Sequence, residues 1–438
     1  MKLFLFGILV ICLIFTVSLL NKATNTQSNA ASVNTLAPES GVLTGNVSIG
    51  NDPNAPGGKY IKFGNVASMY FYGINEHPQW IRAQDMSQLV GYMAAAGIQS
   101  VRIDMSWNSI EPVTKGAYDF TNRIPRFDAF IAQCAAHNIE VVAILLDTPG
   151  WAVGSKTSPA TNSSRVVPPD DLNATGYQGG PGSQNYNDYI GFVMDRWGIH
   201  GKSSSGTKWI NHWEVWNEPN GYWAWSEATG TKSVYGEGKP DPMKYVWLLK
   251  GAYTKIKQVD KTALVLAPSI SGANYIEWTD TEHFNWLDFV YSQGIKNYFD
   301  IFDAHYYGNG TDGQTYATPL DQVLALHAKY TVPIMAKYGD QNKRVWITET
   351  GVPGYGNGIP SLGVQSAVTQ ATALTTAYKY ARTQMFTVDR LFWYTFTGGD
   401  TGTSDQDYFG IVGSPYPNGL ADPWPMKPAY NALKAIPK

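Results

Sequence analysis

Residues 140–146 read Glu-Val-Val-Ala-Ile-Leu-Leu, a short apolar run that a turn signal follows at Thr148-Pro149-Gly150. Such a run is typical of a buried β-strand. Seven further runs of this kind, rich in Val, Ile and aromatic residues, recur along the chain, and each precedes a turn signal. The eight expected strands are Met69 to Asn75, Ser100 to Asp104, Glu140 to Leu146, His212 to Glu218, Ala263 to Ile270, Phe299 to His305, Arg344 to Glu349 and Arg390 to Thr397.

Helical patterns lie between these strands. Ile81 to Ala96 ends at Gly97, a common helix stop, and Asp241-Pro242 supplies an N-cap and a first-turn proline. Leu362 to Gln384 has Ala, Gln and Leu at helical spacing, and Lys427 to Ala435 is a short final helix. Strands and helices that alternate in this way predict parallel strands joined by helical crossovers.

Eight such units predict an α/β fold, a single (β/α)8 TIM barrel with the active site at the carboxyl ends of its strands. A doubly wound open sheet is the structural alternative. It would require a glycine-rich phosphate loop after its first strand, and Gly73-Ile74-Asn75-Glu76 is not such a loop. We therefore expect the barrel.

The N-terminus has an export pattern. Met1-Lys2 precedes an apolar run from Leu3 to Leu20, as in a signal peptide, and the run is also long enough for an uncleaved anchor. We expect residues 1–23 to be a signal peptide or N-terminal membrane anchor, 24–58 a flexible linker and 59–438 the catalytic domain. Both alternatives predict a secreted protein, or a membrane-anchored one that faces outward.

Composition excludes some partners. Only 15% of the 438 residues are charged and the formal net charge is -3, which leaves neither a polybasic face for nucleic acid nor an acidic tail. Two cysteines, Cys12 and Cys134, predict no useful disulfide, and no Cys/His cluster indicates a metal or another cofactor. The 15 Trp and 27 Tyr residues fit a large core or a sugar-binding cleft.

Two of the expected strands end in glutamates. The fourth runs into Trp213-Glu214-Val215-Trp216-Asn217-Glu218-Pro219-Asn220, and the seventh into Val345-Trp346-Ile347-Thr348-Glu349. Carboxylates at two strand ends of a barrel can face each other across its mouth. A retaining glycosidase requires this arrangement, with carboxyl groups about 5–5.5 Å apart.

These two motifs look like the paired signatures of clan A glycoside hydrolases. The stretch Trp213 to Asn220 resembles glycoside hydrolase family 39 and related polysaccharide endoglycosidases, and family 5 is the near alternative because it shares much of the pattern. The resemblance extends from about Tyr70 to Leu433. Three further stretches contribute to it: Val101-Arg102-Ile103-Asp104, Thr148-Pro149-Gly150-Trp151-Ala152 and Lys427-Pro428-Ala429-Tyr430-Asn431.

The resemblance implies roles for matching residues. Glu218 would be the general acid and then the base, and Glu349 the nucleophile. Asn217 would bind the sugar 2-hydroxyl. The resemblance also implies substrate binding by His305 and Tyr307, from a His-x-Tyr pattern in which Tyr307 would keep the nucleophile ionised, and by Trp393 as the floor of the cleavage subsite. Trp151, in one of the matching stretches, Trp223, in the loop after Glu218, and Arg102 are the other expected substrate-binding residues.

Arg102 also has an independent physical argument. Arg102 and Glu214 fall inside strands, where a charge is costly unless it is paired. We expect Arg102 to lie near both Glu214 and Glu349, where it would lower the pKa of the nucleophile. Glu218 would instead need a raised pKa to carry its proton. On this basis Arg102→Met should raise the pH of the acidic limb of activity.

Several assignments have structural alternatives. His305, Trp151 and Trp393 could be plain core residues. Trp223 and Trp225 could form extra subsites or could clamp the loop after Glu218. The residues Glu76 and His77, which follow the first strand, could contact sugar hydroxyls.

The predicted function is hydrolysis of O-glycosidic bonds in an extracellular polysaccharide or oligosaccharide by double displacement, with endo action on a β-linked glycan. Alternatives are an exo-acting β-xylosidase-like enzyme, a catalytically inactive sugar-binding barrel, and a tethered adhesion protein. The sequence does not specify the sugar or the oligomeric state.

Overall fold

The computed structural model describes residues 47–51, 59–63, 71–158, 161–198, 209–230, 232–233, 236–271, 285–307, 331–354, 367–384, 388–398, 408–413 and 424–438. The chain divides into two units, residues 1–67 and 68–438. In the first, β1 (Val47–Asn51) pairs antiparallel with β2 (Lys59–Phe63). β1 lies within the segment expected as the linker, and the second unit begins at Ser68. The expected boundaries of the linker and of the catalytic domain stay predictions.

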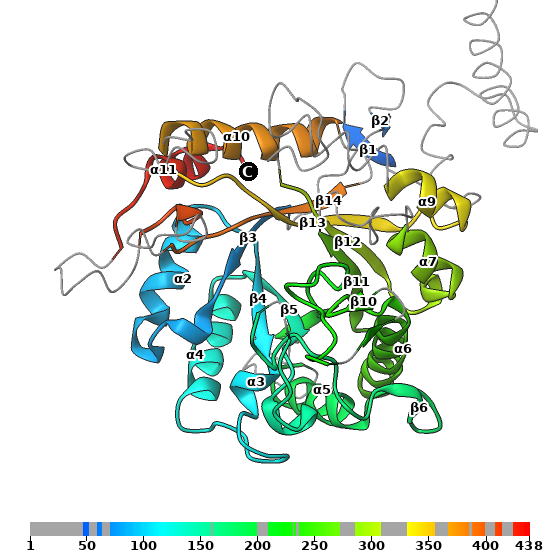
Figure 1. The fold of residues 1–438 in the computed structure, drawn as a ribbon. Helices are drawn as coiled ribbons and strands as arrows, with labels where there is room; N and C mark the ends of the chain where they lie inside the picture. The colour runs from blue at the N-terminus through cyan, green and yellow to red at the C-terminus, as the bar shows by residue number, and fades with distance from the viewer. Residues whose placement is uncertain are drawn as a thin grey trace, which may run out of the picture. The chain divides into compact units, whose positions relative to one another are not determined.

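The second unit contains a closed eight-stranded barrel, in which every neighbouring pair is parallel (Figure 1). It confirms the predicted (β/α)8 TIM barrel, and each predicted strand overlaps an observed one. The strand order around the barrel is β11-β12-β13-β14-β3-β4-β5-β8. Its strands are β3 (Tyr72–Glu76), β4 (Ser100–Ser106), β5 (Glu140–Leu146), β8 (Ile210–Val215), β11 (Leu264–Ser271), β12 (Ile301–His305), β13 (Arg344–Thr350) and β14 (Val388–Trp393).

Helices surround the barrel strands, as the blue-to-red course of the ribbon shows (Figure 1). They are α2 (Met86–Ala95), α3 (Trp107–Ile110), α4 (Arg123–Ala136), α5 (Gln184–Trp197), α6 (Pro242–Val259), α7 (Trp286–Ser292), α9 (Val332–Lys337), α10 (Ala367–Gln384) and α11 (Pro428–Ala435). Short 3-10 helices are η3 (Pro78–Trp80), η4 (Ala83–Asp85), η5 (Gly150–Val153) and η7 (Ile295–Asn297), and short hairpin strands are β6 (Asn173–Tyr177), β7 (Gly180–Gly182), β9 (Lys232–Ser233) and β10 (Gly236–Glu237).

The predicted helix signals have the expected effects. Asp241 caps α6, since its side chain accepts the backbone N–H of Met243. Gly97, just beyond α2, has a φ of 75°, the left-handed conformation that glycine adopts at helix ends. The predicted helix over Ile81 to Ala96 is split into η4 and α2. The beginning of the Leu362 to Gln384 pattern lies outside the described residues.

Alternation along the strands divides the core into two layers. Val142, Leu266, Ile301, Trp346 and Phe392 cluster inside the barrel. Residues of the opposite parity pack between the strands and the helices, which is where buried Cys134 of α4 also lies. Side chains of the inner parity near the carboxyl ends of the strands, such as Arg102 of β4, therefore point into the mouth of the barrel.

The predicted signal or anchor segment, with Cys12, lies outside the described residues. Among the helices that the structure does describe, none combines the length and the apolar character that a membrane crossing requires.

Candidate active site

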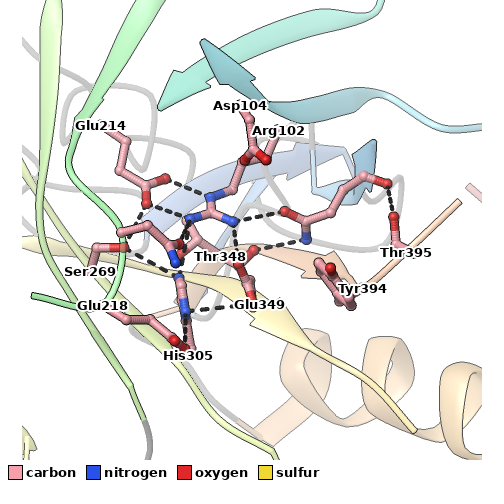
Figure 2. Close-up of polar contacts among 12 residues, drawn as sticks. Arg102, Asp104, Glu214, Glu218, Ser269, His305, Thr348, Glu349, Tyr394 and Thr395 are labelled. Carbon is pink, nitrogen blue, oxygen red and sulfur yellow. Dashed lines mark hydrogen bonds and ion pairs between the residues drawn. The ribbon is translucent and has the colours of Figure 1, made fainter. Parts of the chain in front are cut away.

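Arg102 is the centre of a buried polar network in the barrel mouth (Figure 2). Its Nε and Nη2 donate to the two oxygens of Glu214, each over 2.6 Å, and its Nη1 donates to Glu349 Oε1 over 2.5 Å. The predicted position of Arg102 beside both glutamates is therefore confirmed. Only 1% of the Arg102 side chain is exposed. Its planar guanidinium binds both carboxylates at once and so fixes Glu349 relative to Glu214.

Two asparagines complete the partners of the guanidinium. Arg102 donates to Asn75 Oδ1 over 2.9 Å and to Asn217 Oδ1 over 2.8 Å. Asn75 also donates to the backbone oxygen of Thr348, which ties β3 to β13, the strand that carries Glu349. The Asn217 oxygen is thus occupied, which directs the two N–H donors of its amide elsewhere. That orientation suits the implied role of Asn217 as a donor to a sugar hydroxyl.

His305 joins the two catalytic candidates. Its Nδ1 lies 2.9 Å from Glu218 Oε1 and 3.6 Å from Glu349 Oε2, and its Nε2 lies 3.3 Å from Arg102 Nη2. Since a carboxylate only accepts, Nδ1 carries the proton that is donated to Glu218. His305 is fully buried. It therefore orients the Glu218 carboxylate instead of forming an exposed sugar contact.

Glu218 lies on the loop after β8 and takes up a left-handed backbone conformation, with a φ of 46°. Its Oε2 accepts the indole N–H of Trp223 over 2.6 Å. Burial would raise the pKa of Glu218, but the hydrogen bonds from His305 and Trp223 outweigh it and lower this pKa below its ordinary value. The expectation of a raised pKa was wrong for the substrate-free site, because the donors surrounding Glu218 favour its ionised form.

Glu349 is held by a second donor besides Arg102. The Tyr307 hydroxyl donates to Glu349 Oε2 over 2.7 Å, in agreement with the role that the family resemblance implies. Burial and the Glu349 charge raise the pKa of Tyr307 well above its ordinary value, so the hydroxyl remains a donor. The two oxygens of Glu349 are therefore each fixed by a separate hydrogen bond.

The two candidate carboxylates are close together. Single ligand atoms of Glu218, His305 and Glu349 all lie within 4.8 Å of one another. A metal ion could in principle use such a set. Here the Arg102 guanidinium is already in contact with Glu349, and the His305 nitrogens face Glu218 and Arg102. A positive group thus occupies the place next to the carboxylates, so the arrangement suits acid–base and nucleophilic chemistry better than cation binding.

Trp393 does not floor the mouth of the barrel. Its side chain is 1% exposed and packs in the layer between strands and helices, since its neighbour Phe392 has the inward parity. The prediction placed Trp393 on the wrong face. The next residue, Tyr394, points into the site instead, with its ring 6.4 Å from the Tyr307 ring and its hydroxyl 3.3 Å from His77 Nε2 (Figure 2).

The other predicted tryptophans have different surroundings. Trp151 is half-buried, packs edge-on against Trp107 and donates to the backbone oxygen of Glu111, so its polar group supports a loop. Trp225 is fully buried against Trp216 and clamps the loop after β8. Trp223 is half-buried, and its indole N–H donates to the Glu218 carboxylate. The two expected roles in this loop were an extra subsite and a loop clamp. Trp225 clamps the loop, whereas Trp223 lies at the candidate site.

Sequence reasoning missed an ion pair at the rim. His77 Nδ1 lies 2.9 Å from Asp104 Oδ2, with 26% and 22% of the two side chains exposed. Burial opposes the charge, but the Asp104 carboxylate outweighs it and raises the pKa of His77 to about 9. His77 can therefore contact a sugar as a cation. Glu76 is fully buried and accepts from Thr397, so it fastens the β14 loop and does not face the mouth.

The chain is similar to solved glycoside hydrolases in its fold. A family 39 glycoside hydrolase from Bacteroides cellulosilyticus WH2 has a TM-score of 0.57 at 19% identity, covering 86% of this chain and 66% of that one. A glucosidase from Croceicoccus marinus gives 0.56 at 16%, covering 90% and 70%. A monomeric β-xylosidase from Caulobacter crescentus gives 0.54 at 17%, covering 85% and 68%.

The chain thus spans about two thirds of the length of these three structures. Its sequence matches no protein-family model and no curated protein. At these identities the similarity shows the barrel fold alone.

Proposed function

We propose that this protein is a retaining glycoside hydrolase that cleaves an extracellular, β-linked polysaccharide or oligosaccharide by double displacement. Glu349 is the nucleophile and Glu218 is the acid and then the base. The observation that carries the proposal is the pair of carboxylates with atoms within 4.8 Å of each other, each held by its own donors. Such a close approach favours the retaining geometry, with carboxyl groups about 5–5.5 Å apart, over the wider inverting one.

The first step forms a covalent intermediate. A Glu349 oxygen attacks the anomeric carbon, the glycosidic C–O bond breaks, and the Glu218 proton passes to the leaving oxygen. Arg102 and Tyr307 orient Glu349 for this attack. In the second step Glu218 takes a proton from water, the water oxygen attacks the same carbon, and the bond to Glu349 breaks. The anomeric configuration is retained after two inversions.

The acid must carry a proton when substrate arrives. Because the surrounding donors lower the pKa of Glu218, the protonated form is populated only in acidic solution. Activity on a substrate with a poor leaving group should therefore be highest at acidic pH and fall as the pH rises. An activated aryl glycoside depends less on the acid and should keep its activity to higher pH.

Endo action on a polymer is supported by the loop after β8. Tyr222 is 47% exposed beside half-buried Trp223, so aromatic surface extends from the acid along one wall. One structural neighbour is a β-xylosidase, which supports a β-linkage and keeps exo action as the alternative. Export is supported by the apolar run near the N-terminus.

The test is turnover of a panel of aryl β-glycosides and β-linked polysaccharides, with the first-formed anomer followed by NMR. Retention of configuration is expected, together with loss of turnover in Glu349→Ala and its rescue by azide as a glycosyl azide. An inverted first product would contradict double displacement. If the wild type and Glu349→Ala were equally inert but bound glycans, the protein would be a sugar-binding barrel.

A further inference from the structure

We propose that Trp80, Arg123 and Arg126 form a subsite for a negatively charged sugar residue, which makes an acidic polysaccharide the substrate class. We refer to these three residues as the rim cluster. The inference rests on the proposed glycoside hydrolase function and narrows it.

Trp80 provides an open aromatic face. It closes η3, which directly follows His77, and its side chain is 55% exposed, unusual for a tryptophan in a chain that buries most others. The Arg123 guanidinium carbon lies 4.9 Å from the ring centroid, so a cation covers part of the indole. The exposed remainder is an apolar surface on which a pyranose ring can stack.

Arg123 and Arg126 bring two positive charges together beside this ring. Both donate from Nη1 to the same backbone oxygen, that of Gln79, and the Arg126 contact is 2.9 Å long. Burial, and then repulsion from Arg126, lower the pKa of Arg123. Two cations on one neutral acceptor repel each other, so an anion bound between or beside them would relieve that repulsion.

The acidic groups near the rim cluster are already engaged. Asp104 pairs with His77, and Asp147 pairs with Arg165. Asp119 accepts backbone N–H groups at the start of α4, including that of Arg123. The Asp119 carboxylate also attracts Arg123, so one carboxylate stands against the two positive charges of Arg123 and Arg126. This side of the mouth therefore has a local excess of cations, although the whole chain has a formal net charge of -3.

Gln79 connects the rim cluster with the catalytic centre. Its backbone oxygen receives both arginines, and its side-chain amide donates to Asp104 Oδ2 over 3.4 Å. Asp104 holds His77, which in turn contacts Tyr394 in the mouth. A glycan that passes over Tyr394 and His77 would thus reach Trp80 within a few sugar units, with its charge next to the arginines.

Guanidinium groups bind carboxylate and sulfate oxygens through paired N–H donors. The anion could therefore be the carboxylate of a uronic acid or a sulfate ester. The two sources share this recognition chemistry, and the experiment has an arm for each.

The test is calorimetric binding in a Glu349→Ala background, which prevents turnover. The probes are oligoglucuronates and oligogalacturonates of about six units, the same oligomers after carboxyl reduction to neutral sugars, and a sulfated xylo-oligosaccharide. The charge variant is Arg123→Gln/Arg126→Gln. Its matched control is Arg82→Gln/Arg344→Gln, which removes two arginines that have acidic partners outside the rim cluster. Trp80→Ala is the third variant, and melting temperatures verify the folding of all.

We expect the charge variant to weaken binding of an acidic oligomer about 10- to 100-fold, the size of one or two lost charged hydrogen bonds. The carboxyl-reduced oligomer should be unaffected by it, whereas Trp80→Ala should weaken both. Preference for the sulfated probe would support the subsite and identify its anion as sulfate. The proposal is overturned if the charge variant and its control behave alike, or if acidic and reduced oligomers lose affinity equally.

Turnover of an aryl glycoside separates this inference from the proposed function. With Glu349 intact, the charge variant should keep its kcat/KM within about twofold, since the rim cluster does not contact the carboxylates. An enzyme inert towards every substrate would contradict hydrolysis, while the binding experiment would still decide the subsite. Full hydrolytic activity with no arginine-dependent binding would contradict the subsite alone.

Discussion

The indole N–H of Trp223 donates to the carboxylate of Glu218 over 2.6 Å. Gly221 permits this approach, because a Cβ at that position would lie 2.5 Å from the Trp223 ring. The tight turn after β8 thus places the Trp223 indole against the carboxylate of Glu218. Trp223, expected to form an extra sugar subsite or to clamp the loop, therefore also influences the pKa of Glu218.

Trp223→Phe should move the basic limb of the pH–activity profile to higher pH. The N–H donor helps to lower the pKa of Glu218, so its removal raises that pKa, and the acid keeps its proton in less acidic solution. A hydrogen bond to a charged group is worth about 1.5–3 kcal/mol, which corresponds to a shift of about 1–2 pH units. The measurement is kcat/KM against pH with an unactivated substrate.

Trp225→Phe is the matched control for this change. Trp225 lies on the same loop but is fully buried against Trp216, so its substitution should reduce stability and leave the limb in place. An unchanged limb in Trp223→Phe, or an equal shift in both variants, would contradict the role of the indole donor.

Tyr307→Phe should lower turnover about 10- to 100-fold with little change in stability. The variant removes the donor to Glu349 Oε2 and leaves the Arg102 contact, so the carboxylate loses one of the two hydrogen bonds that orient it. Tyr306→Phe is the comparison, since that hydroxyl is buried against Thr331 Oγ1 away from the carboxylates. Steady-state kinetics should find Tyr306→Phe near wild type, and equal losses in the two variants would be inconsistent with a specific role for Tyr307.

Arg102→Met should destabilise the barrel by about 3–5 kcal/mol, because it leaves Glu214 buried without its cation. Replacing both members, as Arg102→Met/Glu214→Leu, should recover much of this loss in urea denaturation. The double variant should nevertheless stay inactive, since Glu349 and Asn217 have lost their common donor. Recovery of activity together with stability would show that Arg102 has a structural role only.

Much of this site could be predicted from the sequence because its chemistry follows strand ends and strand parity. Glu349 follows from its place at the end of a strand, and the pairing of Arg102 with Glu214 follows from a charge that must be neutralised within a barrel. Tyr307 was implied by the family resemblance through the His-x-Tyr pattern, and the two-residue period of a strand agrees with it because His305 and Tyr307 share a face.

The remaining features depend on loops and on where a strand ends. Trp393 was assigned to the mouth from the family resemblance, whereas its side chain packs on the outer face of β14 and Tyr394, which follows the end of that strand, enters the site. The pKa direction of Glu218 depends on Trp223, whose position requires the turn at Gly221. Nothing in a linear pattern relates these residues, because loop conformation follows from many weak contacts.

The His77–Asp104 pair should make stability depend on pH in the neutral to alkaline range. Since the pKa of His77 is raised from 6.5 to about 9, its contribution is complete below pH 6.5 and is lost as the pH rises through 9. Asp104→Asn should therefore reduce the free energy of unfolding by about 1–3 kcal/mol more at pH 6 than at pH 10. Asp85→Asn is the control, because Asp85 pairs with an arginine that does not titrate in this range. Urea denaturation at several pH values should give a difference that shrinks with pH for Asp104→Asn and stays flat for Asp85→Asn; a flat difference in both would mean that His77 is neutral throughout.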